Sequence, residues 1–585
     1  MHLERIEISG FRGIKRMSLS FDELTVLIGE NAWGKSSLLD ALSIALPTDA
    51  NFYTFKFSDF HVDYAIGHEK MSQLHIVLHW HEDYPSESKA RRYRSFAPLW
   101  VRKDGIKHLY YEISSTIEGD KVTTTRSFLN SKGQHITCDN NDKLVKQLMV
   151  LHPVVRIRDA RRLHDKNPQN NSVDKPLTQH TGNHLSKQGA QNGHNGNGHA
   201  SSSPHNGNHT ESDLVAKNNR IQRRLDNTCR RLMTSPGHVN SGELKSSINA
   251  LRSLVDHYFA FTPHNRSEKF NRAHFPSYIQ TNTNPLEQLS QPQMTKQSRL
   301  VLMGLLNAYI RARGPVELKR ISRPIMILED PEGRLHPTIL HQAWAFIDSM
   351  PMQKILTTNS PDLISTVPIH SIKKLIREPD KTQPHSLTPT TLSKDEERRV
   401  SFHIRLHRPS AMFARAWLLV EGETEVWLFN ELAMLCGYHF AAEGVHIIEF
   451  AQSGLRPLIK VARSMGIEWH LVSDGDMAGR RYGDTVRSML GNDAERHRLT
   501  VLPDRDIEHF LYNNGYEPLF RELANITSDA PMPPRKIIRR ALKRYAKPDV
   551  ALAMVAYSDE HGQEKIPLLI RWILKRIVAM SRGLG

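Results

Sequence analysis

Short apolar runs bounded by turn residues dominate the first 165 residues. The runs "LERIEI", "LTVLIG" and "LHIVLHW" have strand length and predict β-strands. Further strand–helix patterns follow around "PIMILED", "KILTTNS" and "RAWLLVEGETEVWLFNELAML". Strands that alternate with helical patterns indicate domains built on parallel sheets. The predicted fold class is therefore α/β.

Residues 167–213 interrupt this pattern. Their only large apolar residues are Val173, Leu177 and Leu185, too few to offset the entropy of ordering, so the segment is predicted to be a disordered linker or insertion. Its histidines could bind metal, but their irregular spacing favours a solvated tract. Residues 214–262 then show a helical pattern, with one apolar face formed by Ile248, Leu251, Leu254, Val255 and Tyr258.

A polar stretch rich in Pro and Thr over 378–400 predicts a domain boundary near residue 405. We expect a first domain over 1–405, which includes the linker and an inserted helical segment. A second domain is expected over 406–520. A basic helical part over 521–585 is expected to complete it.

Composition favours a soluble protein with a polyanionic partner. The chain has 585 residues, enough for two or three domains, and its 78 Lys+Arg against 62 Asp+Glu give a formal charge of +16. Its 3 cysteines lie far apart, which suits a reducing compartment and neither a zinc cluster nor a disulfide framework. Without an apolar run of about 18 residues or a signal peptide, we expect a cytoplasmic protein with no membrane partner.

A nucleotide site is predicted at "GENAWGKSS", residues 29–37, between a predicted strand and a predicted helix. The spacing matches G-x-x-x-x-G-K-[ST], in which Gly29 and Gly34 let backbone N–H groups surround phosphates and Lys35 supplies a cation. Ser36 can bind Mg²⁺ through its hydroxyl. The expected ligand is ATP with Mg²⁺, and the expected contacts from this loop are Gly29, Asn31, Gly34, Lys35, Ser36 and Ser37.

Two later strands offer the other parts of such a site. "PIMILEDPEGRLHP" ends a buried strand in Glu329 and Asp330, where a P-loop ATPase holds its metal and orients water. "KILTTNSPDLI" is a second apolar strand that ends in small polar residues around Asn359, where a γ-phosphate sensor usually lies.

Together "ISGFRGI", "GENAWGKSS", "ILEDPEGRLHP" and "TTNSP" resemble the ABC-type ATPases of the RecF and SMC group. The resemblance implies that Arg12 approaches the phosphates, that Glu329 is the metal acid, that Asp330 is the catalytic base and that Asn359 takes the switch position. It also implies a homodimer, because ABC sites form between two copies. The acid pair is Glu-Asp, Asn359 replaces a histidine, and "LSQPQMTKQ" at 289–297 lacks the signature glycines, so binding is expected rather than fast hydrolysis.

A cluster of carboxylates is predicted in the C-terminal half. In "WLLVEGETEVW" Glu421 ends a strand and Glu425 lies in the first turn of a helix, which could alternatively be only favourable charge at a helix start. About 50 residues later the strand "WHLVS" ends in Asp474 and Asp476, and a turn at Gly475 can direct both inward. Oxygen ligands without Cys or His suit Mg²⁺ or Mn²⁺.

Glu-Gly-x-x-Glu followed by Asp-x-Asp resembles the Toprim domain, and an ABC ATPase followed by Toprim resembles the OLD (overcoming lysogenisation defect) nucleases. The expected fold is thus an ABC-type P-loop ATPase domain followed by a Toprim α/β domain. The resemblance implies a two-metal site formed by Glu421, Glu425, Asp474, Asp476 and Glu508. Glu421 would serve as general base or metal ligand, and Lys565 would neutralise charge on the phosphate.

The stretch "PPRKIIRRALKRYAK", residues 533–547, predicts a helix with a basic stripe opposite an apolar face, suited to the backbone of DNA. "RIRDARRL" at 156–163 is a second basic cluster; both could equally be solvated surface. The sequence as a whole favours an ATP-binding, metal-dependent DNA endonuclease that acts in phage defence or DNA repair. The alternatives are a DNA-binding repair-type ATPase without nuclease activity and a topoisomerase-like strand passer.

Overall fold

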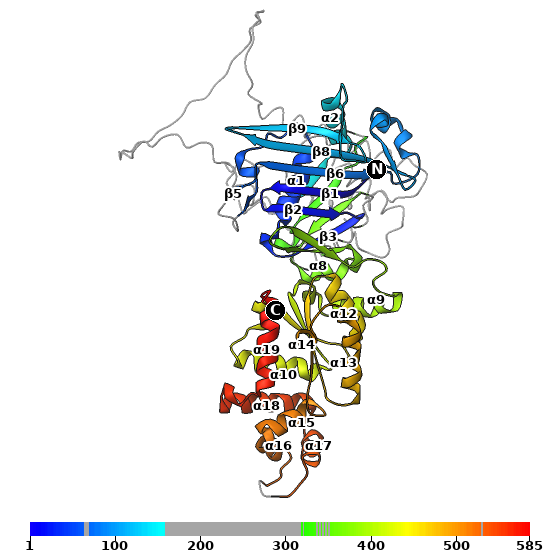
Figure 1. The fold of residues 1–585 in the computed structure, drawn as a ribbon. Helices are drawn as coiled ribbons and strands as arrows, with labels where there is room; N and C mark the ends of the chain where they lie inside the picture. The colour runs from blue at the N-terminus through cyan, green and yellow to red at the C-terminus, as the bar shows by residue number, and fades with distance from the viewer. Residues whose placement is uncertain are drawn as a thin grey trace, which may run out of the picture. The chain divides into compact units, whose positions relative to one another are not determined.

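The computed structural model describes residues 1–63, 69–157, 318–319, 321–334, 337, 341, 344, 348, 352–527 and 530–584. Met1–Arg158 and Leu318–Gly585 group into one unit, and the other unit, 159–317, lies outside the described residues. The segments expected at 167–213 and 214–262, the stretch at 289–297 and most of the basic cluster at 156–163 fall there. Two main sheets organise the described part of the chain (Figure 1).

A 13-stranded sheet forms the N-terminal half, which we call the head (residues 1–157 and 318–413). Its order is β10-β9-β8-β6-β1-β2-β15-β14-β3-β13-β12-β11, and β7 pairs with β8. The strands are β1 His2–Phe11, β2 Ile14–Ser20, β3 Leu24–Ile28, β6 Gln73–His81, β7 Val101–Lys103, β8 Ile106–Glu118, β9 Lys121–Leu129, β10 His135–Ile136, β11 Val154–Ile157, β12 Ile325–Glu329, β13 Lys354–Thr357, β14 Ile372–Arg377 and β15 Thr382–Ser386. A separate pair joins β4 Val62–Asp63 and β5 Glu69–Lys70.

Hydrophobic patterning explains the two parts of this sheet. The part from β10 to β2 is antiparallel, and its strands alternate buried and solvated residues: on β1, Leu3, Ile6 and Ile8 are buried. In the part from β3 to β11 the strands are parallel, and every residue of β12 is buried. The head helices are α1 Lys35–Ala45, α2 Asn141–Leu151, α8 Pro361–Thr366 and α9 Lys394–Val400.

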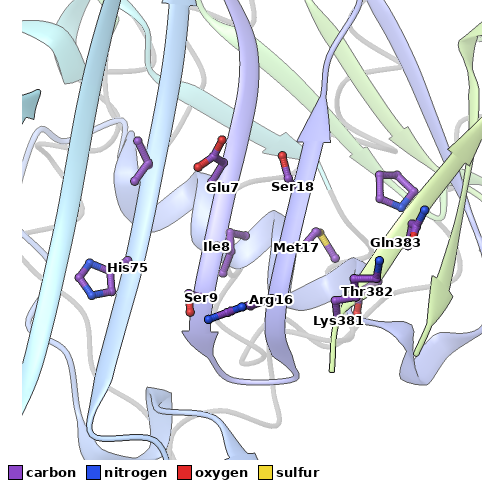
Figure 2. A pocket seen from close by; sticks show the side chains of 12 residues that line it. Glu7, Ile8, Ser9, Arg16, Met17, Ser18, His75, Lys381, Thr382 and Gln383 are labelled. Carbon is purple, nitrogen blue, oxygen red and sulfur yellow. The ribbon is translucent and has the colours of Figure 1, made fainter. Parts of the chain in front are cut away.

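The outer, polar face of the antiparallel part is hollowed where β1, β2, β6 and β15 meet (Figure 2). β2 and β15 run parallel but pair only at Met17 and Thr382. Because the two strands are otherwise not hydrogen-bonded to each other, they leave a cavity of about 590 Å³.

The C-terminal domain (residues 416–584) is built on a four-stranded sheet, ordered β17-β16-β18-β19, in which every pair is parallel. Its strands are β16 Ala416–Val420, β17 Val445–Glu449, β18 Glu468–Ser473 and β19 Leu499–Val501. α10 Glu423–Leu435 and α19 Leu568–Ser581 lie against one face of this sheet, and α12 Leu455–Ser464 and α13 Met477–Met489 lie against the other (Figure 1). All four strands end at the same edge.

α11 Phe440–Glu443 and α14 Glu495–Arg498 directly precede β17 and β19, at the opposite edge of the sheet. Four further helices extend the apolar core; they are α15 Ile507–Leu511, α16 Glu517–Leu523, α17 Pro534–Arg544 and α18 Lys547–His561. Ile537 and Ile538 of α17 join one hydrophobic cluster with Val420 of β16. The residues after 520 therefore share a core with the sheet, although the expected domain limits themselves stay a prediction.

The sequence predicts one helix over 533–547, and the predicted C-terminal end is wrong. α17 stops at Arg544, and a new helix starts at Lys547. The reason is Pro548, which cannot lie inside a continuous helix without removing a backbone hydrogen bond, and Tyr545 and Ala546 are extended. The α/β class and the predicted strands that end at Glu329, Val420 and Ser473 are confirmed. In the part of the chain described here, no helix is long and apolar enough to cross a membrane.

Candidate functional site

The predicted phosphate loop connects β3 to α1. Gly29 and Gly34 have φ values of 141° and 91°, which favour glycine. A Cβ on Gly29 would lie 2.7 Å from the carbonyl oxygen of Leu375, so the space also excludes a side chain. Gly34 precedes the first turn of α1, which leaves free backbone N–H groups directed out of the helix start. The loop therefore has the backbone of a phosphate cradle.

Lys35 lies inside this loop. Its Nζ donates to Oδ1 of Asn359 at 2.8 Å and to the carbonyl oxygen of Gly29. Burial lowers the pKa of Lys35, and the negative charges of Asp330 and Glu332 act against that effect. The structure thus brings the predicted residues Lys35 and Asn359 together from β3 and β13.

The other residues predicted to contact the nucleotide lie on either side of Lys35 in the sequence. Asn31 and Ser36 are exposed, on the short turn before α1 and on its first turn. Ser37 accepts a hydrogen bond from the backbone N–H of Gly13 at 3.3 Å, which ties the loop after β1 to α1.

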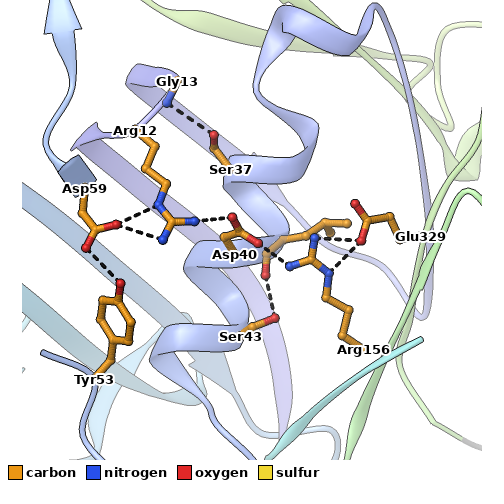
Figure 3. A network of polar contacts seen from close by, with 10 residues as sticks. Arg12, Gly13, Ser37, Asp40, Ser43, Tyr53, Asp59, Arg156 and Glu329 are labelled. Carbon is orange, nitrogen blue, oxygen red and sulfur yellow. Dashed lines mark hydrogen bonds and ion pairs between the residues drawn. The ribbon is translucent and has the colours of Figure 1, made fainter. Parts of the chain in front are cut away.

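A network of arginines and carboxylates lies beside α1 (Figure 3). Arg156 of β11 binds Glu329 with Nε at 3.0 Å and Nη2 at 2.8 Å. Asp40 of α1 forms ion pairs with both Arg156 and Arg12, and Arg12 also binds Asp59 at 2.8 Å. A phosphate contact by Arg12 or a metal contact by Glu329 would require these ion pairs to open.

Asp330 and Glu332 complete the head site. Asp330 has a φ of 43°, unusual for a non-glycine residue, and its Oδ1 accepts from Oγ1 of Thr357 at 3.1 Å. Glu332 accepts from the backbone N–H of Asn359 at 2.7 Å and from Oγ1 of Thr358 at 3.0 Å. Sequence reasoning missed Glu332, although it is the third acid of "EDPE", and missed Asp40, which carries no motif signal. It counted Arg156 only in the basic cluster at 156–163.

In the C-terminal domain the predicted acids meet at the edge where β16 and β18 end. Glu421 follows β16, and Oε2 of Glu425 accepts from the backbone N–H of Gly422 at 3.1 Å. Asp474 follows β18, and Oδ1 of Asp476 caps α13 by accepting from the N–H of Gly479 at 2.8 Å. We call Glu421, Glu425, Asp474, Asp476, Asp506 and Glu508 the acid cluster.

Gly475 permits this arrangement through its lack of a side chain. A Cβ there would lie 2.3 Å from the carbonyl oxygen of Asp504 and 2.5 Å from that of Leu502. Its own N–H donates to the carbonyl oxygen of Asp504 at 2.9 Å. The turn after β18 is therefore packed directly on the segment after β19, which carries Asp506 and Glu508.

The acids of the cluster act on one another. Burial and the charges of Glu425, Glu421, Asp506 and Glu508 raise the pKa of Asp474 to about 8. Burial and the charges of Asp476 and Glu425 also raise the pKa of Glu421. Within the described residues, no three carboxylates or imidazoles converge closely enough to hold a metal ion in this conformation. The donors are all oxygen, which fits Mg²⁺ or Mn²⁺, and binding would require side-chain rotation.

The predicted phosphate contact of Lys565 stays a prediction, and the structure shows only its nearest neighbours. Nζ of Lys565 lies 5.3 Å from the ring of Tyr557 and beside Gly515. Lys547, at the start of α18, lies 3.4 Å from Oε1 of the buried Glu508. Partial burial acts to lower the pKa of Lys547, but Glu508 and the other acids raise it. Sequence reasoning counted Lys547 only in the basic stripe.

Unpaired cations flank the acid cluster. Exposed arginines and lysines of α13 and α17 make no ion pair or side-chain hydrogen bond with any described residue; they are Arg480, Arg481, Arg535, Lys536, Arg539, Arg540, Lys543 and Arg544. α13 begins at the capping residue Asp476, and α17 packs on α18, which begins at Lys547. These cations therefore lie on helices that start at, or pack against, elements that carry the acids.

Comparison with known proteins covers the whole chain. Residues 1–202 and 202–411 match the family described as "Protein of unknown function (DUF2813)", and residues 412–476 match "Overcoming lysogenization defect protein-like, TOPRIM domain". The "Uncharacterized protein YbjD" of Escherichia coli (strain K12) is 38% identical over 591 residues, which is 100% of both chains.

Solved structures match parts of the chain at low identity. The C-terminal region of the Burkholderia pseudomallei OLD protein is 17% identical and covers 30% of this chain and 100% of its own, with a TM-score of 0.25. An SMC head domain from Thermotoga maritima is 11% identical and covers 66% and 100%, with a TM-score of 0.29. On the sequence matches, the chain belongs to the DUF2813 family, and its C-terminal part carries an OLD-like Toprim domain.

Proposed function

We propose that this protein is a divalent-metal-dependent DNA endonuclease whose cleavage is regulated by ATP bound at the head. The observation that carries the proposal is the acid cluster, which gathers carboxylates from the ends of adjacent strands between two groups of unpaired cations. The OLD-like Toprim match over residues 412–476 supports a nuclease at the level of the family.

The acid cluster would hold Mg²⁺ or Mn²⁺ through Glu421, Glu425, Asp474, Asp476 and Glu508. Bound there, the metal would activate water and stabilise the charge that develops on a phosphodiester. Glu421, whose pKa is raised by burial and by Asp476, is suited to take a proton from the attacking water. Lys547 would compensate negative charge on the phosphate, the role first expected of Lys565.

The unpaired cations of α13 and α17 would bind the DNA backbone. Lysine and arginine that neutralise phosphates release counterions, which gives affinity without base recognition. Six of these side chains lie on the solvated side of α17, opposite the buried Ile537 and Ile538. This arrangement supports a DNA substrate over a small phosphate ester.

The head would bind ATP with Mg²⁺ and hydrolyse it slowly. Lys35 and the backbone of Gly29–Gly34 would hold the phosphates. Glu329 is bound by Arg156, and Asn359 cannot provide a titratable side chain at the switch position. Both features support regulation by binding rather than by rapid turnover. A homodimer remains part of the proposal, because ABC-type sites close between two copies.

Glu421→Gln should abolish metal-dependent nicking of plasmid DNA. The change removes a charge worth several kcal/mol to the metal or to the proton transfer, which is at least about a hundredfold in rate. Glu423→Gln is the matched control, because Glu423 is an exposed acid on the same helix start. Equal loss of activity in both variants, or in neither, would contradict the assigned role of Glu421.

Lys547→Ala should lower cleavage by about tenfold or more, since a charged hydrogen bond contributes roughly 1.5–3 kcal/mol. Lys565→Ala should leave the rate within about twofold, because its ammonium group packs on Tyr557 instead. Both rates are measured at saturating Mn²⁺ on the same plasmid. If Lys565→Ala lowers the cleavage rate more than Lys547→Ala does, then Lys565 is the residue that compensates charge on the phosphate.

Asp474→Asn should raise the melting temperature of the metal-free protein at pH 8. Because the folded-state pKa of Asp474 is about 8, the folded protein keeps a proton that the unfolded chain releases near its ordinary pKa of 3.8. Stability of the wild type therefore falls as the pH rises from about 4 to 8, and the neutral amide removes this loss. Thermal melts of the wild type and the variant in EDTA at pH 5 and pH 8 measure this difference in stability. A lower melting temperature for the variant than for the wild type at pH 8 would refute repulsion among the acids.

Lys35→Ala should abolish ATP binding and any effect of ATP on nicking, while nicking by the metal alone is retained. Lys35 contacts Gly29 and Asn359 in the head and no residue of the acid cluster. Nucleotide binding and DNA cleavage are assayed on one preparation at fixed metal concentration. If nicking without ATP also disappears while circular dichroism stays native, the two sites are obligatorily coupled and regulation by ATP is the wrong description.

A further inference from the structure

The outer face of the head sheet carries a second polar site, independent of the nuclease proposal. The cavity of about 590 Å³ lies among β1, β2, β6 and β15 and has the size of a small-ligand pocket (Figure 2). Its polar side chains point away from the core, which contains Ile6, Leu19 and the buried leucines of α1. The phosphate loop contacts the core side of the same sheet, since a Cβ on Gly34 would meet Ile14 and Met17.

Strand register arranges the lining residues in two rows. Ser9 of β1 pairs with His75 of β6 and with Arg16 of β2, and Glu7 pairs with Val77 and with Ser18. β15 joins at Met17 and Thr382, so its next outward residues are Lys381 and Gln383. One row therefore runs His75–Ser9–Arg16–Lys381 and the other Val77–Glu7–Ser18–Gln383, as Figure 2 shows.

The first row has spare positive charge. Arg16 is exposed and makes no hydrogen bond or ion pair with any described residue. Lys381 has only an exposed contact with Glu378 at 3.5 Å, which contributes little. His75 accompanies them, and its hydrogen bond to Glu112 raises its pKa. The neighbouring Arg12 and Arg156, in contrast, are fully paired with carboxylates.

The second row offers hydrogen-bonding groups and little free charge. Glu7 is its only carboxylate, and Arg5 forms an ion pair with it at 3.0 Å. Burial lowers the pKa of the nearby His79, so that imidazole adds no charge. Ser18 and Gln383 supply a hydroxyl and an amide, which can donate and accept. With neighbouring strands about 4.8 Å apart, the four strands span roughly 14 Å, enough for a mononucleotide.

We propose that this cavity binds a small phosphorylated ligand of mononucleotide size. Its phosphate lies between Arg16 and Lys381, and its sugar or base lies against Ser18 and Gln383. An arginine that presents its guanidinium to a hollow, with no partner among the residues that the structure describes, matches a phosphate in geometry and charge. The lining residues all lie on four adjacent strands that span roughly 14 Å, so a single small ligand fits the hollow better than a continuous polynucleotide.

Calorimetric titration of the full chain carrying Lys35→Ala tests the proposal, because that change weakens the phosphate loop. The probes are AMP, adenosine and inorganic phosphate. AMP should bind with one equivalent per chain, inorganic phosphate more weakly, and adenosine at least tenfold more weakly than AMP. Adding Arg16→Ala should weaken AMP at least tenfold, and Lys381→Ala should weaken it to a smaller extent.

Arg102→Ala is the matched control, since Arg102 is an exposed arginine of β7 outside the cavity, and it should change nothing. A thermal melt confirms folding of each variant, which the exposure of Arg16 leads us to expect. Absence of saturable binding by both AMP and inorganic phosphate overturns the proposal, as does AMP binding that is unchanged by Arg16→Ala. Binding of a DNA oligonucleotide that depends on Arg16, without binding of AMP, overturns it in favour of a polynucleotide surface.

Discussion

Repulsion among carboxylates at the ends of β16 and β18 is the constraint on which the C-terminal domain depends. Parallel strands bring their carboxyl ends to one edge, so Glu421 and Asp474 lie together whatever their charge. The cost is visible in Asp474, whose pKa rises to about 8. Among the described residues Lys547 pairs with Glu508 and His509 pairs with Asp506, whereas the other four acids of the cluster have no ion-pair partner there.

The head resolves the same problem internally. Asp40, Asp59 and Glu329 are all bound by Arg12 or Arg156, so each carboxylate of this network has an arginine partner without a ligand. The two sites therefore differ in what they require. The head network joins α1 to β12 through paired charges, whereas four acids of the cluster have no such partner among the described residues, which is the charge that the proposed metal would compensate. This contrast is the physical ground for assigning metal-dependent chemistry to the C-terminal domain and regulation to the head.

Local patterns predicted much of this from the sequence. The phosphate loop, the acids after β12, β16 and β18, and the α/β class follow from strand–turn–helix patterns that the chain encodes locally. Lys547 and Arg156 could not be found in this way, because their partners lie 39 and 173 positions away and only the fold brings them together. The break between α17 and α18 follows from Pro548, whereas the regular basic spacing ends at Arg544, where α17 itself ends.

The most direct test of the account is incubation of the purified wild-type chain with supercoiled plasmid DNA in Mg²⁺, in Mn²⁺ and in EDTA, each with and without ATP. The account predicts nicked or linear DNA with free ends in the presence of either metal, none in EDTA, and a rate that changes when ATP is added. Intact supercoiled DNA under all metal conditions, from protein that binds DNA, would contradict the nuclease assignment. DNA covalently linked to protein would contradict it as well, in favour of strand passage.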